Sequence, residues 1–228
     1  MLKVMGQIVR KPDMPLDAFR LHWRTIHRGL ALRLAHAGLL RGYVQNHRLD
    51  IDVDGLMPIA DGVPELWFDD PQAFAQLRTS EALLAGAFQD EPRFMDIGRY
   101  RTLLLEPESI ALAPSRKQCA GLLKLMLFLR ADEGEGPLPL ADAVRFSTHC
   151  RSSASATVPL SGHDRVETSW WRSLEDFASA WARRTRGAPV DGMLVEERPV
   201  FWPGEEIPPA DWTPVAETRP RPSPGTAE

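Results

Sequence analysis

The histidine at position 27 is the side chain of this sequence whose placement most favours proton transfer. Apolar residues recur around it at the spacing of one helix face, and we expect a helix over residues 16–37. The apolar residues of this face are Phe19, Trp23, Ile26, Leu30 and Leu34. Packed between such a helix and a sheet, an imidazole can accept and return a proton at neutral pH. A core histidine with one satisfied hydrogen bond fits the same pattern, so both interpretations stay open.

A strand expected over residues 41–49 carries the next group of polar side chains. Its alternation assigns the side chains to two faces: Tyr43, Gln45 and His47 to one, and Val44, Asn46 and Arg48 to the other. A phenol, an amide and an imidazole side by side are costly to bury without partners. This face therefore indicates either a polar ligand nearby or an exposed sheet edge, and the pattern does not choose between them.

Motifs for other chemistries are missing from the sequence. It has no G-x-G-x-x-G, no G-x-x-x-x-G-K-[ST], no H-E-x-x-H and no G-x-S-x-G, and its six histidines are scattered. Cys150 follows His149 directly, and adjacent residues of a helix point about 100° apart, so an activated thiol is not indicated. We expect neither a metal nor a cofactor.

Composition excludes several classes of protein. The chain has 228 residues and a formal net charge of −4, which gives no electrostatic basis for nucleic-acid binding. No apolar run approaches the ~20 residues that span a bilayer, and the N-terminus lacks the features of a secretory signal. Two cysteines cannot form a disulfide framework. We expect a cytoplasmic protein that binds no membrane.

An internal repeat divides the chain into two halves. Residues 61–74 align without a gap with residues 164–177, so that Trp67 matches Trp170 and Phe74 matches Phe177. Each segment has the pattern of a strand running into a helix. Each half also opens with a strand, at residues 2–10 and 120–130, continues into a helix that begins near Pro15 or Pro139, and closes with a strand.

The order of elements in each half is β-α-β-β-α-β, which is the ferredoxin-like arrangement. The predicted fold is α+β, with two such repeats packed sheet to sheet as one intramolecular α+β barrel. The expected domains are a first repeat over 1–111, a linker over 112–118, a second repeat over 119–203 and a proline-rich tail over 204–228. We expect Trp202 and Trp212 to anchor this tail and the residues after about 219 to be disordered.

Four segments of the first half form a recurring pattern when they are taken in order. They are the F-x-x-x-W-x-x-x-H-x-x-L run from Phe19 to Leu30, the run Gly42-Tyr43-Val44-Gln45-Asn46, residues 61–70 with Glu65 and Trp67, and residues 88–90. Together they resemble an EthD domain, a branch of the dimeric α+β barrel superfamily. The resemblance covers residues 2–107.

The resemblance implies a cavity between helices and sheet. In isomerase and cyclase relatives, a histidine on the first helix and a tyrosine on the second strand take part in proton transfer, and these roles map onto His27 and Tyr43. Asn46 and Glu65 belong to the family pattern without a firm role. The second half resembles a diverged copy, in which we expect residues 142–153 to form a helix that has no counterpart of His27.

The favoured function is a cofactor-independent lyase or isomerase, of the cyclase or dehydratase type, acting on a small cyclic or polyketide-like molecule. His27 and Tyr43 are the predicted catalytic residues. The predicted substrate-binding residues are Trp23, Asn46, His47, Glu65 and Trp67. The alternatives are a monooxygenase of the same superfamily, with or without haem, and a non-catalytic binding barrel. The expected partner is a small-molecule substrate, and pairing of two such barrels into a homodimer stays open.

Overall fold

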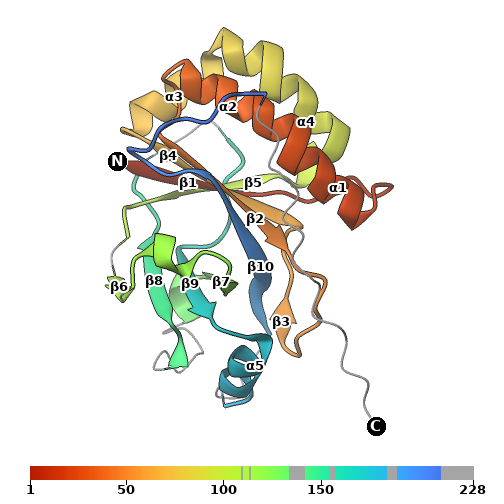
Figure 1. Ribbon diagram of the computed structural model, residues 1–228, viewed down its shortest axis with the longest axis vertical. Coiled ribbons are helices and arrows are strands. Elements are labelled where there is room, and N and C mark those ends of the chain that lie inside the picture. Colours follow the sequence, from red (N-terminus) through yellow and green to blue (C-terminus); the bar gives the residue numbers. More distant parts are fainter. Residues whose placement is uncertain (109, 113, 134–141, 155–157, 184–188, 212–228) are drawn as a thin grey trace.

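The computed structural model describes residues 1–108, 110–112, 114–133, 142–154, 158–183 and 189–211 (Figure 1). The strands are β1 (Leu2–Gln7), β2 (Gly42–Arg48), β3 (Leu56–Met57), β4 (Gly62–Phe68), β5 (Arg101–Leu105), β6 (Ile110–Leu112), β7 (Leu123–Leu129), β8 (Arg145–Cys150), β9 (Arg165–Trp171) and β10 (Val190–Phe201). The α-helices are α1 (Leu16–His22), α2 (Arg28–His36), α3 (Pro71–Thr79), α4 (Phe88–Phe94) and α5 (Leu174–Ala182). None of the helices in the described part of the chain is long and apolar enough to cross a membrane.

The described strands form one ten-stranded sheet that curves into a nearly closed barrel. Its order is β5-β1-β4-β2-β10-β7-β9-β8-β6, with β3 paired to β10 off this path. In each half, the four main strands follow the ferredoxin-like order of fourth, first, third and second. The second strand of the first half pairs antiparallel with the last strand of the second half, so the two sheets are continuous.

Backbone hydrogen bonds connect the far edges of the two sheets. The amide of Thr102 on β5 donates to the carbonyl of Pro159 at 2.9 Å, and the amide of Ser161 donates back to Thr102 at 2.8 Å. The amide of Ser152 donates to Leu104 at 2.8 Å. The predicted intramolecular α+β barrel is therefore confirmed, with the two halves hydrogen-bonded to each other at both sheet edges.

The prediction of a helix over residues 142–153 is wrong, because this segment contains strand β8. Its side chains alternate: Ser147 and His149 face the barrel interior with Thr168 of β9, while Phe146 faces outward. The prediction followed the repeat analogy and overlooked this period of two. Among the described residues of the second half, α5 is the single α-helix, although the ferredoxin-like strand order is kept. Pro139 lies outside the described residues.

The first helix of the first half forms as expected, with a local difference. It consists of α1, a π-helical turn over Trp23–His27 and α2. Phe19 and Trp23 are completely buried, whereas Ile26 is 54% exposed. Because a π-helical turn is wider, it rotates the chain less per residue, and Ile26 falls outside the buried face.

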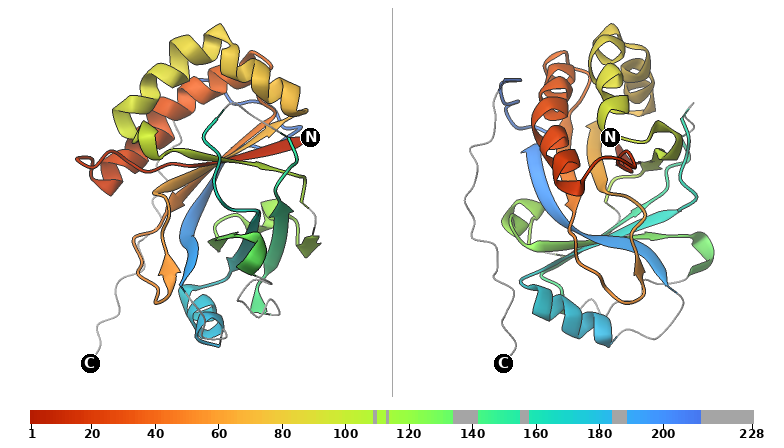
Figure 2. Two further views of the ribbon diagram at one scale, coloured as in Figure 1. Left: turned by 180° about the vertical axis from the view of Figure 1, so that it is seen from behind. Right: turned by 90° about the vertical axis from the view of Figure 1, so that its right-hand side faces the viewer.

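Three apolar layers follow from the alternation of the strands. The outward side chains of the first sheet, including Val4 and Tyr43, pack beneath α2 and α3, and Ile8 packs against α1 and α4. Inward side chains such as Met5 and Met126 fill part of the barrel interior. Leu127 and Trp171 pack beneath α5. Figure 2 shows the four helices of the first half gathered over one sheet and α5 at the opposite end of the molecule.

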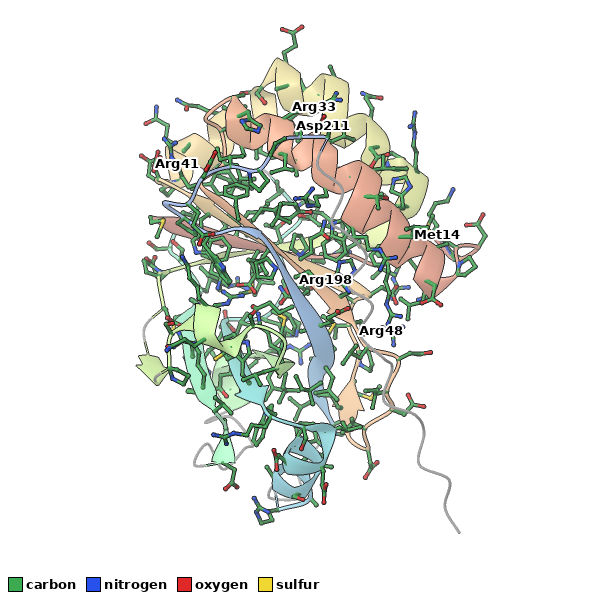
Figure 3. All side chains as sticks on the ribbon, in the orientation of Figure 1. Met14, Arg33, Arg41, Arg48, Arg198 and Asp211 are labelled. Atoms are coloured by element: carbon green, nitrogen blue, oxygen red, sulfur yellow. The ribbon has the colours of Figure 1, made fainter. Side chains whose placement is uncertain are left out.

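The chain after β10 turns back over the first half. The carbonyl oxygen of Pro208 accepts a hydrogen bond from Nε2 of His36 at 2.9 Å, and Ile207 and Ala210 pack against the helix–sheet core. This arm passes close to α2, since a Cβ at Gly29 would lie 2.8 Å from the carbonyl oxygen of Ala210 (Figure 3). Trp202 packs edge-on against Trp67, with 6.0 Å between ring centroids. The expectations for Trp212 and for the end of the tail lie outside the described residues.

A close approach between β4 and the first helix yields a test of this packing. A Cβ at Gly62 would come within 2.3 Å of the Trp23 ring, which is completely buried. We expect Gly62→Ala to lower the free energy of unfolding by about 1–3 kcal/mol, as overpacking does. Urea denaturation measures the change.

Gly86→Ala is the matched control. A Cβ there meets Leu30 at an ordinary 3.9 Å. Because alanine favours a helix more than glycine does, this variant should be more stable than wild type, by up to about 1 kcal/mol. If both variants unfolded at the wild-type urea midpoint, the inferred contact between Gly62 and Trp23 would be wrong.

Candidate active site

His27 lies beside a buried carboxylate on the neighbouring helix. Its Nδ1 is 3.1 Å from Oδ2 of Asp90, at the start of α4. Nε2 of His22, one turn earlier in the chain, lies 3.0 Å from both oxygens of the same carboxylate. The Asp90 side chain is only 3% exposed, and the His27 side chain is 13% exposed.

These contacts determine which nitrogen of His27 can accept a proton from a ligand. Burial alone would raise the pKa of Asp90, but the hydrogen bonds from His27 and His22 outweigh it and hold the pKa below its ordinary value. An ionised carboxylate only accepts hydrogen bonds, so Nδ1 of His27 carries the proton. Nε2 then carries a lone pair, and it has no hydrogen-bond partner among the described residues. A carboxylate that binds one nitrogen of a histidine in this way orients the other nitrogen to act as a base.

Tyr43 contributes a hydroxyl to the same region. Its oxygen accepts a hydrogen bond from Nε1 of Trp23 at 3.0 Å and another from Nε2 of Gln45 at 2.8 Å. Burial raises the pKa of Tyr43 well above its ordinary value, so the phenol keeps its proton. With both contacts accepted, the hydroxyl proton remains available to donate to a ligand oxygen.

A third titratable group, Glu91, directly follows Asp90. Burial, opposed by the charge of Arg78 and aided by that of Asp90, raises the pKa of its carboxyl to about 7. Tyr100 lies close enough to interact with it, and burial raises the pKa of this phenol to about 12. A carboxyl that titrates near pH 7 is suited to give or take a proton in a catalytic cycle.

His27, Tyr43, Glu91 and Tyr100 line one cavity between the helices and the sheet, whereas Asp90 contacts His27 from outside its lining. The volume of this cavity is about 90 Å³. The polar residues of its lining are His27, Tyr43, Arg78, Glu91, Tyr100 and Thr102, and Trp23 and Leu66 are among its apolar residues. The cavity therefore combines an apolar wall with convergent polar groups, which is typical of a small-molecule site.

The predicted binding residues separate into two groups. Trp23 lines the cavity. His47 lies on the same side of the sheet, with its ring 4.5 Å from that of Trp23, but it does not line the cavity. Burial holds the pKa of His47 well below its usual value, so this imidazole is neutral and is part of the packed interior. Its Nε2 donates to Gln45 at 3.1 Å.

Asn46, Glu65 and Trp67 lie on the other side of the sheet, facing the barrel interior. The amide of Asn46 donates to Oε1 of Glu65 at 2.9 Å, and both groups bond to Nζ of Lys124. Strand alternation is the reason: Asn46 is an odd number of residues from Tyr43, so the two cannot share a face. These three residues therefore do not join His27 and Tyr43 around one ligand.

Asp90 and Glu91 are functional candidates that the sequence reasoning missed. Residues 88–90 belong to the recurring family pattern, which was the available signal for Asp90. Glu91 carries no motif, and its raised pKa results from burial by elements distant in sequence. Within the described part of the chain, no group of three or more His, Cys, Asp or Glu side chains is placed to hold a metal ion.

Sequence comparison finds a family match in the first half. Residues 11–98 match the model of the EthD domain. This stretch of the chain is similar to an EthD domain. No curated protein sequence matches this chain.

Structure comparison shows the fold of the whole chain. An anthrone oxidase-like protein superposes with a TM-score of 0.55 at 12% sequence identity, over 90% of this chain and 94% of that one. A putative monooxygenase from Fusobacterium nucleatum gives a TM-score of 0.41 at 7% identity, over 87% and 93% of the two chains. A putative chlorite dismutase gives 0.43 at 9% identity, over 88% and 94%. The chain thus has the dimeric α+β barrel fold, made from a single polypeptide.

The raised pKa of Glu91 predicts a pH-dependent stability. The folded protein keeps the Glu91 proton up to about pH 7, whereas the unfolded chain releases it near 4.5. The stability that this group contributes is therefore lost as the pH rises from about 4.5 to 7. Glu91→Gln should match wild type at pH 4 and exceed it at pH 8, by up to about 3 kcal/mol.

Urea denaturation of both proteins at a series of pH values measures this difference. Glu81→Gln, on the exposed side of the same helical region, is the control and should give a difference that does not change with pH. A pH-independent difference for Glu91→Gln as well would show that Glu91 ionises normally.

Proposed function

We propose that this protein is a cofactor-independent lyase or isomerase that moves a proton next to a carbonyl group of a small cyclic or polyketide-like molecule. The observation that carries the proposal is the pair formed by His27 and Asp90 at the wall of the helix–sheet cavity. Nε2 of His27 is the base, and Asp90 stabilises the imidazolium that forms. The similarity of the first half to an EthD domain supports a site in this cavity.

The other polar groups fit the remaining steps of such a reaction. When His27 removes the proton, negative charge develops on the carbonyl oxygen, and the Tyr43 hydroxyl donates a hydrogen bond to it. Glu91, with a pKa of about 7, is protonated in a large fraction of molecules at neutral pH. It can return a proton at another carbon, which completes an isomerisation, or protonate a leaving hydroxyl, which completes a dehydration. No oxidant or other co-reactant is consumed.

A small ketone is the direct test. 3-Cyclohexen-1-one is a single ring suited to a small cavity, and proton transfer converts it to conjugated 2-cyclohexen-1-one, which is followed by ultraviolet absorbance. We expect His27→Asn to reduce the rate at least ~10²-fold, because an amide cannot exchange a proton at neutral pH. His36→Asn is the control, since this exposed histidine of α2 lies outside the cavity.

A second measurement tests proton abstraction even if 3-cyclohexen-1-one is not a substrate. Deuterium uptake from D₂O into a panel of small cyclic ketones and lactones, measured by mass spectrometry, reports proton abstraction without turnover. If wild type and His27→Asn exchanged every compound at the same rate, the protein would be a binding barrel and His27 a structural residue.

Tyr43→Phe tests the hydrogen bond to the developing oxyanion. The variant keeps the ring in the core and removes only the hydroxyl, so we expect an intact fold and a rate lower by about 10²-fold. Circular dichroism checks the fold, and the kinetic constants of the same ketone check the effect. A fall in affinity without a fall in the turnover number would mean that Tyr43 binds the ground state only.

Oxygenation is the second candidate function. It is favoured by the fold shared with a protein described as anthrone oxidase-like, because oxidation of an anthrone also begins with loss of an acidic proton. An oxygen electrode distinguishes the two functions: consumption of O₂ with anthrone, dependent on His27, would replace the isomerase proposal with the monooxygenase.

A further inference from the structure

A second cavity, of about 460 Å³, lies at one end of the barrel interior. Its walls include Lys3, Trp67, Arg116, His149 and Trp202. None of the residues that line it also lines the helix–sheet cavity. It is therefore a separate space, formed by both halves of the chain, the segment between them and the start of the C-terminal arm.

Two residues of the cavity wall, Lys3 and Arg116, belong to a network of five buried charges that contact one another. The cations are Lys3, Arg116 and Lys124, and the anions are Glu65 and Glu197. The network thus carries one positive charge more than its own carboxylates neutralise. Isolated charge is costly in a buried environment, which favours a ligand of opposite sign.

The ionised groups around the network do not remove this excess. At the rim, the carboxylate of Glu108 is paired with Arg145 at 2.6 Å, and the carboxylate of Glu205 is paired with Lys117. His149 is neutral, because burial and the charge of Lys3 lower its pKa to about 2. Each of these neighbours is either paired or uncharged, so the positive charge remains.

Lys3 and Arg116, at the cavity wall, each keep one proton that has no acceptor among the residues that the structure describes. Nζ of Lys3 donates to Oε2 of Glu65 at 2.6 Å and to Nε2 of His149 at 2.9 Å, which uses two of its three protons. The guanidinium of Arg116 makes four contacts with Glu65 and Glu197 through its five donors. By contrast, Lys124 has an acceptor for each proton.

Flat aromatic surfaces stand next to these donors. The rings of Trp67 and Trp202 meet edge to face at 6.0 Å. The Arg116 guanidinium lies over both, 5.6 Å from the centroid of Trp67 and 4.8 Å from that of Trp202. A planar apolar group can pack against such rings while an attached anion reaches the cations.

We propose that this cavity binds a small monocarboxylate with an aromatic body. The excess charge of the network matches the charge of one carboxylate. The two oxygens accept the remaining protons of Lys3 and Arg116, and the ring packs on Trp67 and Trp202. The pKa of Lys3, which burial and the neighbouring cations lower to about 8, agrees with an ammonium whose charge is incompletely balanced.

Isothermal titration of the full chain with benzoate tests the proposal. Benzyl alcohol keeps the ring without the charge, and acetate keeps the charge without the ring. We expect benzoate to bind at least tenfold more tightly than either compound, because each lacks one of the two recognised features.

Lys3→Met removes the excess charge, while Glu65 keeps Lys124 and Arg116 as partners, so the fold should persist. We expect it to weaken benzoate binding at least tenfold. Lys11→Met makes the same change of charge away from this cavity and should bind like wild type. Trp202→Ala, at the start of the C-terminal arm, removes one ring wall and should weaken benzoate more than acetate.

Four results would overturn the proposal: no heat of binding at about 10 mM benzoate, equal affinity for benzoate and benzyl alcohol, unchanged affinity in both Lys3→Met and Trp202→Ala, or loss of affinity in His27→Asn. The last would locate the probe in the helix–sheet cavity. Benzoate binding that survives His27→Asn supports this second site, whatever the outcome of the catalytic tests.

Discussion

The carboxylate of Glu65 is the group on which the assembly of the barrel depends most directly. It is completely buried on β4 and accepts hydrogen bonds from Lys3 of the first half, Lys124 of the second half and Arg116 of the segment between them. Burial by itself would raise the pKa of Glu65, but the three cations hold it well below its usual value. A neutral residue at this position would leave buried cations without a partner, which is strongly destabilising.

The sheet also separates two kinds of chemistry. Because successive side chains of a strand point to opposite faces, β2 presents Tyr43 to the helix side and Asn46 to the barrel interior. On the helix side, an Asp90–His27 pair is placed beside an apolar cavity. On the interior side, Lys3, Arg116 and Trp67 line a larger space. β4 lines both spaces, because Leu66 faces the helix–sheet cavity and Trp67 faces the cavity of the barrel interior.

Much of the fold could be predicted from local patterns. The apolar spacing around Trp23 and His27 indicated the first helix, and the repeat around Trp67 and Trp170 indicated the duplicated strand order. The incorrect helix at 142–153 arose because the repeat was extended to a segment whose own alternation indicates a strand. Similarity between halves predicts strand order better than it predicts the connections, since connections tolerate large changes in length.

The candidate site could be predicted only in part. His27 and Tyr43 stood out because a polar residue on an apolar face is detectable in sequence. The properties of Asp90 and Glu91 depend on how α4 packs against α1, which no local pattern reveals. Lys124 was visible as a lysine within an apolar run, but its partners are 59 to 78 residues away. Long-range contacts of this kind require the structure.

The pairing of β2 with β10 has a consequence for how the chain reaches this structure. The two strands are separated by roughly 150 residues, and β10 is also the strand that pairs with β7. During synthesis, the first half can therefore form its helices and four strands while the edge of β2 still lacks its neighbour. Unpaired strand edges recruit other chains, and pairings so distant in sequence form slowly. The interval before β10 leaves the ribosome is thus the period in which this protein is most prone to aggregate.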